Sequence, residues 1–126
     1  ERGQGGLIVN IGSVAGSQTY ADGAVYCASK HAVHALSEGM RIDLLKHGIK
    51  VSEVRPGMVE TEFSVVRFHG DRQRADKVYE GVKPLSAEDI ADVIGWIVSL
   101  PPHVNVNDIL VMPTQQADAH YTDRKP

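Results

Sequence analysis

A tyrosine and a lysine, Tyr26 and Lys30, stand four residues apart within a stretch of helical periodicity. Residues at this spacing share one face of a helix, with their Cβ atoms about 6 Å apart. A free phenol ionises at about pH 10, which is too high for a base at neutrality, but an adjacent ammonium group favours the phenolate. The pair could therefore exchange a proton with a hydroxyl or carbonyl oxygen of a substrate.

A serine and a proline–glycine turn follow two short apolar runs that we predict to be strands. Ser13 comes just after residues 7–11, and Pro56 and Gly57 follow residues 49–54. Neighbouring parallel strands end at one edge of a sheet, where open α/β folds bind their ligands. The sequence therefore predicts one crevice at this edge, with the serine hydroxyl holding the same substrate oxygen as the tyrosine.

Helices and strands alternate along the chain to position these residues. Apolar side chains recur at three- and four-residue steps over residues 24–47, which predicts a helix that ends before Gly48. Residues 58–85 are polar and are predicted to be irregular. Ser86 begins a second helix with a capping box, and residues 108–112 form a third strand. The order strand, helix, strand, helix, strand predicts an α/β fold with an open parallel sheet.

The motifs of the sequence resemble those of a known family, the short-chain dehydrogenases/reductases. The similar segments, in order, are Asn-Ile-Gly-Ser-Val-Ala-Gly at 10–16, Tyr-Cys-Ala-Ser-Lys at 26–30 and Pro-Gly-Met-Val-Glu-Thr at 56–61. The resemblance covers nearly the whole chain. It implies that residues 1–126 are the carboxyl-terminal catalytic half of a Rossmann-type doubly wound sheet, with three strands, two main helices and a substrate lid at 58–85.

The same resemblance implies that the amino-terminal half, which would hold the cofactor phosphates, is absent from the chain. The family's glycine-rich turn lies between its first strand and helix, and it is expected upstream of Glu1. The glycine-rich opening at residues 3–6 does not replace it, because no strand precedes it and no helix follows it. We therefore expect the isolated chain to bind cofactor weakly or not at all.

The resemblance also assigns roles to the candidate residues. Tyr26 is the general acid/base, Ser13 polarises the substrate oxygen, and Lys30 supports the tyrosine and bonds the nicotinamide ribose. Val59 and Thr61 contact the nicotinamide carboxamide. The cofactor is NADP, with NAD left open, and the cofactor-binding set is Tyr26, Lys30, Pro56, Gly57, Val59 and Thr61.

Within the family, residues 62–68, 99–105 and 112–114 are similar to the NADP-dependent 3-hydroxy acid dehydrogenases, which oxidise serine, allo-threonine and related acids. This similarity makes Arg67 a candidate partner for the substrate carboxylate, because arginine binds carboxylates through two parallel hydrogen bonds. Two simpler interpretations stay open. The Arg67 side chain is equally consistent with a solvated charge, and Thr61 with a turn hydroxyl that caps a helix.

Composition excludes several other classes of function. The net charge of −3 is spread along the chain, which gives no basic surface for nucleic acid or for an anionic membrane. The single cysteine, Cys27, is consistent with a reducing, cytoplasmic location. His31 and His34 stand three residues apart, but no carboxylate or cysteine is spaced to complete a metal site with them, so we expect no metal.

Two statements about partners complete the expectations from sequence. In the family that this chain resembles, the long helix packs against its twin in a neighbouring subunit, which implies a homodimer or homotetramer. A rival interpretation is that the chain is a non-catalytic oligomerisation module, or an inactive fragment of such a dehydrogenase. The intact serine, tyrosine and lysine set argues against the rival, because a scaffold does not need that chemistry.

Overall fold

The computed structural model describes residues 5–126, which form a three-stranded parallel sheet in the order β1-β2-β3. The strands are β1 (Gly6–Ile11), β2 (Ile49–Pro56) and β3 (Asp108–Val111). The predicted α/β class is confirmed, and the third strand is one residue shorter than its predicted range. Residues 3 and 4 of the glycine-rich opening lie outside the described residues.

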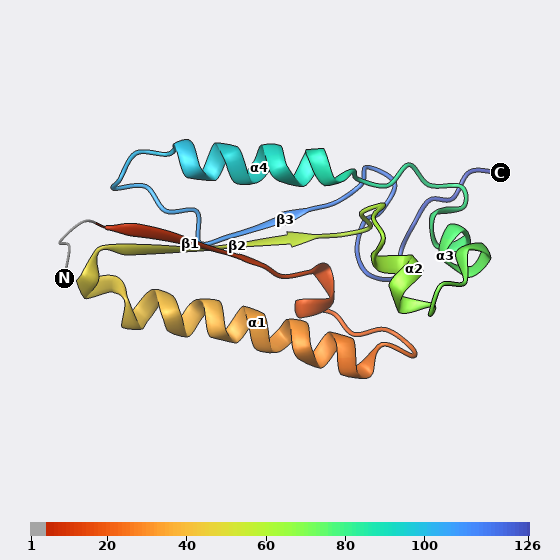
Figure 1. Ribbon diagram of the computed structural model, residues 1–126, viewed down its shortest axis with the longest axis horizontal. Helices are drawn as coiled ribbons and strands as arrows, with labels where there is room; N and C mark the ends of the chain where they lie inside the picture. The colour runs from red at the N-terminus through yellow and green to blue at the C-terminus, as the bar shows by residue number, and fades with distance from the viewer. Residues whose placement is uncertain (1–4) are drawn as a thin grey trace.

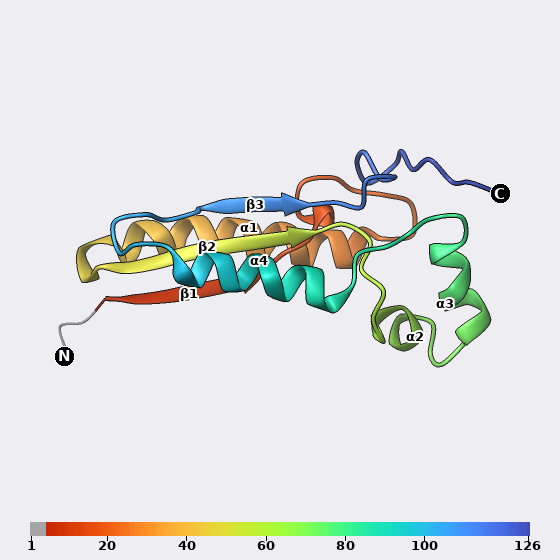
Figure 2. The ribbon, with the colours of Figure 1, turned by 90° about the horizontal axis from the view of Figure 1, so that it is seen from above.

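Two helices cover opposite faces of the sheet, α1 (Ala24–Asp43) on one side and α4 (Ala87–Ser99) on the other (Figure 1). Seen from the side of α4, the three strands run in the same direction, and the helix passes over β1 and β2 (Figure 2). Val54 on β2 and Ile97 on α4 are fully buried and form the centre of the apolar core. A helix must cross over between consecutive parallel strands, and α1 and α4 are those crossovers.

The end of α1 and the start of α4 are set by residues that the sequence analysis identified. Helix α1 stops at Asp43, four residues before the predicted end, because the chain tightens into a 3₁₀ turn, η2 (Leu45–His47). Gly48 then adopts the left-handed conformation, with φ of 65°, as expected of a helix-terminating glycine. At α4 the predicted capping box is confirmed, because the Ser86 side chain and Asp89 bond each other's backbone amides.

The prediction that the lid segment, residues 58–85, is irregular was wrong. It contains two short helices, α2 (Phe63–Arg67) and α3 (Arg72–Tyr79), which lie beyond the carboxyl end of β2 (Figure 1). The side chain of Asp71 caps α3 by accepting a hydrogen bond from the Arg74 amide. The residues of α3 are mostly charged, so no apolar stripe marks the helix in the sequence.

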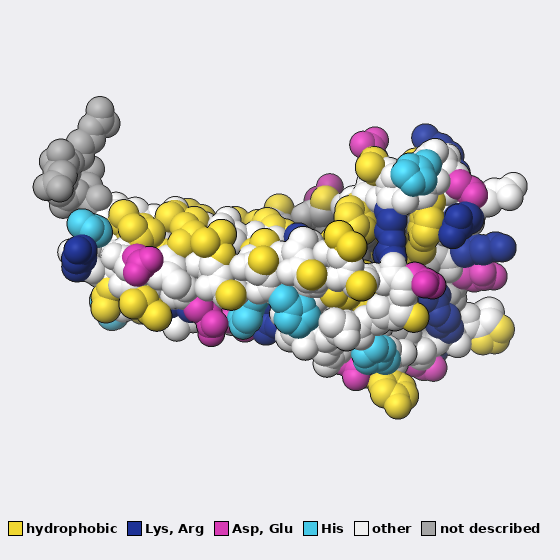
Figure 3. Space-filling model, turned by 90° about the horizontal axis from the view of Figure 1, so that it is seen from below, with side chains coloured by type: hydrophobic (Ala, Val, Ile, Leu, Met, Phe, Trp, Pro, Cys, Tyr) yellow, Lys and Arg dark blue, Asp and Glu magenta, His cyan; other side chains and the backbone are white. Residues whose placement is uncertain are grey.

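The outer face of α1 exposes a row of hydrophobic side chains, seen along the length of the molecule in Figure 3. Val25, Leu36 and Ile42 on this helix are 86%, 59% and 74% exposed, and Leu45 just beyond it is 75% exposed. Contiguous apolar surface of this kind is typical of an interface. Despite this apolar face, none of the helices in the described part of the chain combines the length and hydropathy needed to span a membrane.

Candidate active site

A cleft of about 410 Å³ lies at the carboxyl ends of β1 and β2, beneath the lid segment. Its walls come from the loop after β1, the first turns of α1, the turn after β2, and both lid helices. The structure brings every candidate residue to this cleft: Ser13, Tyr26, Lys30, Pro56, Gly57, Val59, Thr61 and Arg67. The roles assigned to them stay predictions, but their predicted convergence is observed.

Ser13 is 8% exposed and begins a single 3₁₀ turn, η1 (Val14–Gly16), immediately after β1. Its Oγ accepts a hydrogen bond from the Ala15 amide at 3.1 Å, which orients the side chain. Because the amide donates, the hydroxyl proton of Ser13 remains available to a ligand oxygen in the cleft. The serine is thus presented as a donor.

Tyr26 and Lys30 lie one turn apart near the start of α1, and both line the cleft. The Lys30 Nζ donates to the Ile11 carbonyl at 3.1 Å, which ties α1 to the end of β1. The same ammonium lies 5.8 Å from the centroid of the Tyr26 ring. On its other side the tyrosine packs against Phe63 of α2, with ring centroids 5.5 Å apart, so the phenol lies between the sheet and the lid.

The turn after β2 is fixed by the segment that follows β3. The Gly57 amide donates to the Val111 carbonyl at 2.8 Å, and the Met58 amide donates to Oε1 of Gln116 at 2.8 Å. A Cβ atom at position 57 would lie 2.5 Å from that Gln116 oxygen. A side chain at position 57 would displace the Gln116 or Met112 side chain, whereas glycine leaves Gln116 in place on the rim of the cleft.

The next residues of the turn contact α3. The Val59 carbonyl accepts a hydrogen bond from the Tyr79 hydroxyl at 2.9 Å, and that hydroxyl also lies 2.7 Å from Ser64 Oγ. Because a carbonyl can only accept, the tyrosine proton goes to Val59, and Ser64 donates to Tyr79. Thr61 accepts from the Phe63 amide at 3.2 Å, as the turn-hydroxyl interpretation expected, and still has a proton to donate.

Arg67 extends from α2 toward the opposite wall. Its guanidinium carbon lies 5.8 Å from the centroid of the Tyr20 ring and 5.6 Å from that of Phe68. Burial raises the pKa of the Tyr20 phenol above its ordinary value of 10.0, so this tyrosine stays neutral. Lys30 and Arg67 are the charged residues among the described lining of the cleft, which has no Asp or Glu, so it favours an anionic ligand.

Sequence reasoning missed five polar or aromatic residues of the cleft, which are Tyr20, Phe63, Ser64, Tyr79 and Gln116. Tyr20 lies in a loop between two motifs, Phe63, Ser64 and Tyr79 lie in the segment that was predicted to be irregular, and Gln116 follows β3. Their spacing carries no periodic signal, because their proximity comes from the way separate loops fold over one edge of the sheet.

Two carboxylates that no sequence spacing indicated lie close to one of the helix histidines, and the expectation of no metal stays a prediction. Ligand atoms of His34, Glu53 and Asp108 all lie within 4.8 Å of one another. Both oxygens of Asp108 are bound by Arg55, through Nε and Nη2, each at 2.6 Å. The guanidinium already neutralises this carboxylate, so a cation would have to compete with it. The sequence showed no such cluster, because its members come from three elements that only the fold brings together.

Comparison with known proteins identifies relatives of this arrangement. A family model described as short chain dehydrogenase matches residues 1–71. The chain is 46% identical over 120 residues to the NADP-dependent 3-hydroxy acid dehydrogenase of Schizosaccharomyces pombe, covering 95% of the chain and 46% of the relative. It is 49% identical over 115 residues to the sulfoacetaldehyde reductase of Chromohalobacter salexigens, covering 91% and 46%.

A solved structure agrees with these relatives. The closed form of serine dehydrogenase complexed with NADP+ superposes with a TM-score of 0.87 at 41% identity, over 95% of this chain and 49% of that one. The chain thus spans about half the length of the curated relatives it matches.

Proposed function

Because the chain belongs to the short-chain dehydrogenase family, we propose that it carries the proton-transfer centre of an NADP-dependent oxidoreductase that acts on a small acid. The observation that carries this proposal is the meeting of Ser13, Tyr26 and Lys30 in one cleft. A phenol, a hydroxyl and an ammonium around one space are the groups needed to move a proton to or from a substrate oxygen.

In the proposed reaction, Tyr26 exchanges a proton with the substrate oxygen. Ser13 donates its free hydroxyl proton to the same oxygen and fixes its position. The Lys30 ammonium stabilises the negative charge on the phenol oxygen through space. Phe63 packs against the tyrosine ring and helps to hold it in the cleft.

The residues on the rim of the cleft fit the nicotinamide end of NADP. Position 57 is a glycine where the backbone passes close to Gln116, and Val59 and Thr61 follow it on the cleft wall, within reach of a carboxamide. Lys30 keeps two further protons, beyond the one given to Ile11, for a ribose hydroxyl. When bound, the cofactor exchanges a hydride with the substrate carbon.

We propose that a further segment of the complete protein supplies the site for the cofactor phosphates. Among the described residues, the loop that joins β1 to α1 carries Ser13 and Tyr20 into the cleft, and it is not the short turn at a helix start that holds phosphates. The relatives named above are about twice as long as this chain. On this proposal the chain is the catalytic half of one Rossmann-type domain, and alone it is inactive.

The substrate we propose is a 3-hydroxy acid such as serine or allo-threonine, with its carboxylate on Arg67. Two observations support it: the cleft is lined by cations without acids, and relatives are named for 3-hydroxy acids and serine. A sulfonate is the second candidate, because a reductase of sulfoacetaldehyde is 49% identical. Comparing turnover of serine, allo-threonine and 3-hydroxypropionate with reduction of sulfoacetaldehyde by NADPH separates the two.

We also propose a cytoplasmic homodimer or homotetramer that associates through α1. The exposed apolar row on this helix supports the association, and the buried, unpaired Cys27 supports a reducing compartment. The rival, a module for oligomerisation without catalysis, predicts an assembly with no turnover of any of these substrates.

The test is the substitution Tyr26→Phe in the complete protein. We expect kcat to fall by about 1000-fold, because general acid–base groups contribute on this scale, while the Kd for NADPH measured by calorimetry changes less than threefold. Tyr121→Phe is the matched control, because Tyr121 is 73% exposed and lies outside the cleft. A Tyr26→Phe enzyme that keeps more than a tenth of wild-type turnover would refute the proposed role.

A further inference from the structure

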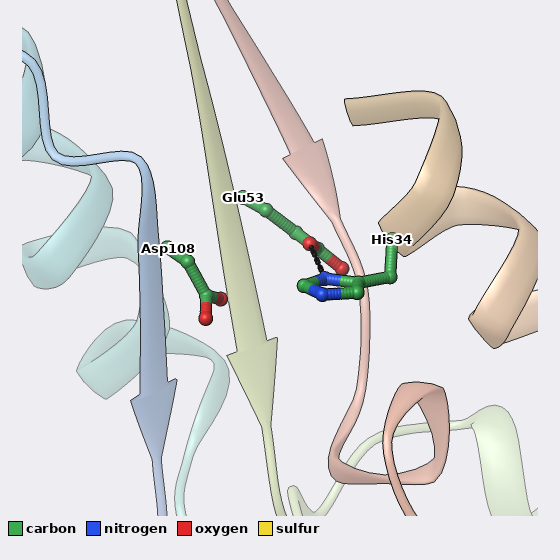
Figure 4. A group of neighbouring side chains, drawn as sticks. All are labelled: His34, Glu53 and Asp108. Carbon is green, nitrogen blue, oxygen red and sulfur yellow. Dashed lines mark hydrogen bonds and ion pairs between the residues drawn. The ribbon is translucent and has the colours of Figure 1, made fainter. Parts of the chain in front are cut away.

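A carboxylate with no part in the proton transfer is buried directly beneath the site. Glu53 lies on β2, its side chain is 1% exposed, and its Oε2 bonds His34 Nδ1 of α1 at 2.6 Å (Figure 4). Its second oxygen, Oε1, is buried without a hydrogen-bond partner among the described residues. A Cβ atom at Gly12 would lie 2.1 Å from this oxygen, so Glu53 contacts the backbone just before Ser13.

Stability does not account for this pairing of a buried carboxylate with a partly exposed histidine. Removing a carboxylate from water costs several kcal/mol of free energy, and a hydrogen bond to one partner offsets only part of that cost. The unpaired Oε1 adds a further penalty. Apolar residues of similar volume in place of a buried ion pair commonly leave stability unchanged or raise it. The pair therefore needs an explanation other than stability.

The positions of Glu53 and His34 in the fold offer such an explanation. On α1, His34 follows Lys30 by one turn and Tyr26 by two, so all three lie along one side of the helix. On β2, Glu53 pairs with Asn10 of β1, two residues before Gly12. The bond from Glu53 to His34 thus joins the helix that carries the tyrosine to β2, which pairs with β1 just before the serine.

We propose that Glu53 and His34 are positioning residues that set the distance between the Ser13 hydroxyl and the Tyr26 phenol. Lys30 makes the first connection between α1 and the end of β1, through the Ile11 carbonyl. One turn further along the helix, Glu53 connects α1 to the neighbouring strand β2 through His34. Together the two contacts restrain α1 from pivoting near Tyr26. This inference rests on the proposed proton transfer between these side chains and the substrate.

The experiment compares single removals with removal of the whole pair in the complete protein. The variants are Glu53→Gln, His34→Gln and the apolar double variant His34→Leu with Glu53→Leu. Glu38→Gln is the control, because Glu38 is exposed on the same helix. The measurements are Tm, kcat and the KM for NADP.

We expect each single variant to lower kcat about tenfold and to lower Tm, with KM for NADP changed less than threefold. The double variant recovers the Tm of the wild type, because no buried charge is left unpaired, while its kcat stays at least tenfold low. Recovery of kcat together with Tm would show a purely structural pair and overturn the proposal. If the double variant does not fold, Glu53→Asp decides: a stable enzyme with unchanged kcat also overturns it.

The outcome distinguishes this inference from the proposed function. A wild-type protein without oxidoreductase activity overturns both. An active wild type that Tyr26→Phe inactivates, with full kcat in the single and double variants, overturns only the positioning role of Glu53 and His34.

Discussion

The two walls of the cleft are built differently. On the sheet wall, Ser13 and Lys30 are fixed by hydrogen bonds with the backbone at and just after the end of β1. On the lid wall, Arg67 extends from a five-residue helix and is held by aromatic rings at 5.8 and 5.6 Å. We infer that the two walls have different roles. The sheet wall is rigid and holds the groups that move the proton, and the lid wall is adaptable and selects the substrate.

The strongest test of the rigid wall is Gly12→Ala. The added Cβ would lie 2.1 Å from Glu53 Oε1 and 3.0 Å from Arg55 Cγ, and the buried carboxylate has little room to move. We expect unfolding free energy to fall by about 3 kcal/mol, the upper range for overpacking, and kcat to fall with it. Thermal unfolding and steady-state kinetics measure both.

Gly39→Ala on α1 is the matched control for that change. Nothing lies within 4 Å of a Cβ atom at position 39. Alanine in a helix interior is favoured over glycine by about 0.5–1 kcal/mol, so this variant gains stability and keeps its turnover. If Gly12→Ala behaved like the control, the sheet wall would not be rigid.

A substitution on the lid wall, Arg67→Gln, should separate substrate binding from proton transfer. The loss of a charged hydrogen-bonding partner for a carboxylate costs about 2 kcal/mol, so we expect KM for the acid substrate to rise about 30-fold. Because Arg67 is on the opposite wall from Ser13, kcat changes less than threefold. A large fall in kcat with unchanged KM would contradict the division between the walls.

The smallest expected effect is that of Tyr79→Phe, which removes the hydroxyl between Val59 and Ser64. A lost neutral hydrogen bond costs about 1 kcal/mol, so KM for NADP should rise about fivefold while Tm changes little. Hydrogen exchange at the amides of residues 59–64 should become faster in the same variant. Unchanged exchange there would show that Tyr79 does not hold the turn.

Much of the fold was predictable because its signals are local. Apolar runs marked the three strands, and Ser86 and Asp89 marked the start of α4 through a capping box that the structure confirms. Gly48 marked the end of the α1 segment. The lid helices were missed because α3 has few apolar residues and depends on contacts with α2 and on the tail, where Arg124 bonds the carbonyls of Val78 and Glu80.

The candidate site likewise has a part that could be predicted from local signals and a part that could not. Ser13, Tyr26 and Lys30 were found because their types and spacing in a strand–helix context indicate chemistry, and the fold brings them into one cleft. The pairing of His34 with Glu53 could not be found, because a helix face and a strand residue far along the chain have no spacing rule that links them. Sequence patterns report on neighbours within one element, whereas such pairs depend on how elements are packed.

The all-parallel sheet has a consequence for how the chain reaches its native state. Gly6 pairs with Ile49 and Glu53 with Asp108, so each strand pair joins residues that a helix separates along the chain. The sheet has no hairpin to nucleate strand pairing. The entropy of closing these long loops is lost before the strand contacts form, and such topologies fold slowly. During that interval the apolar strand β1 and the outer face of α1 are open to other chains, and we expect refolding yield to fall as protein concentration rises.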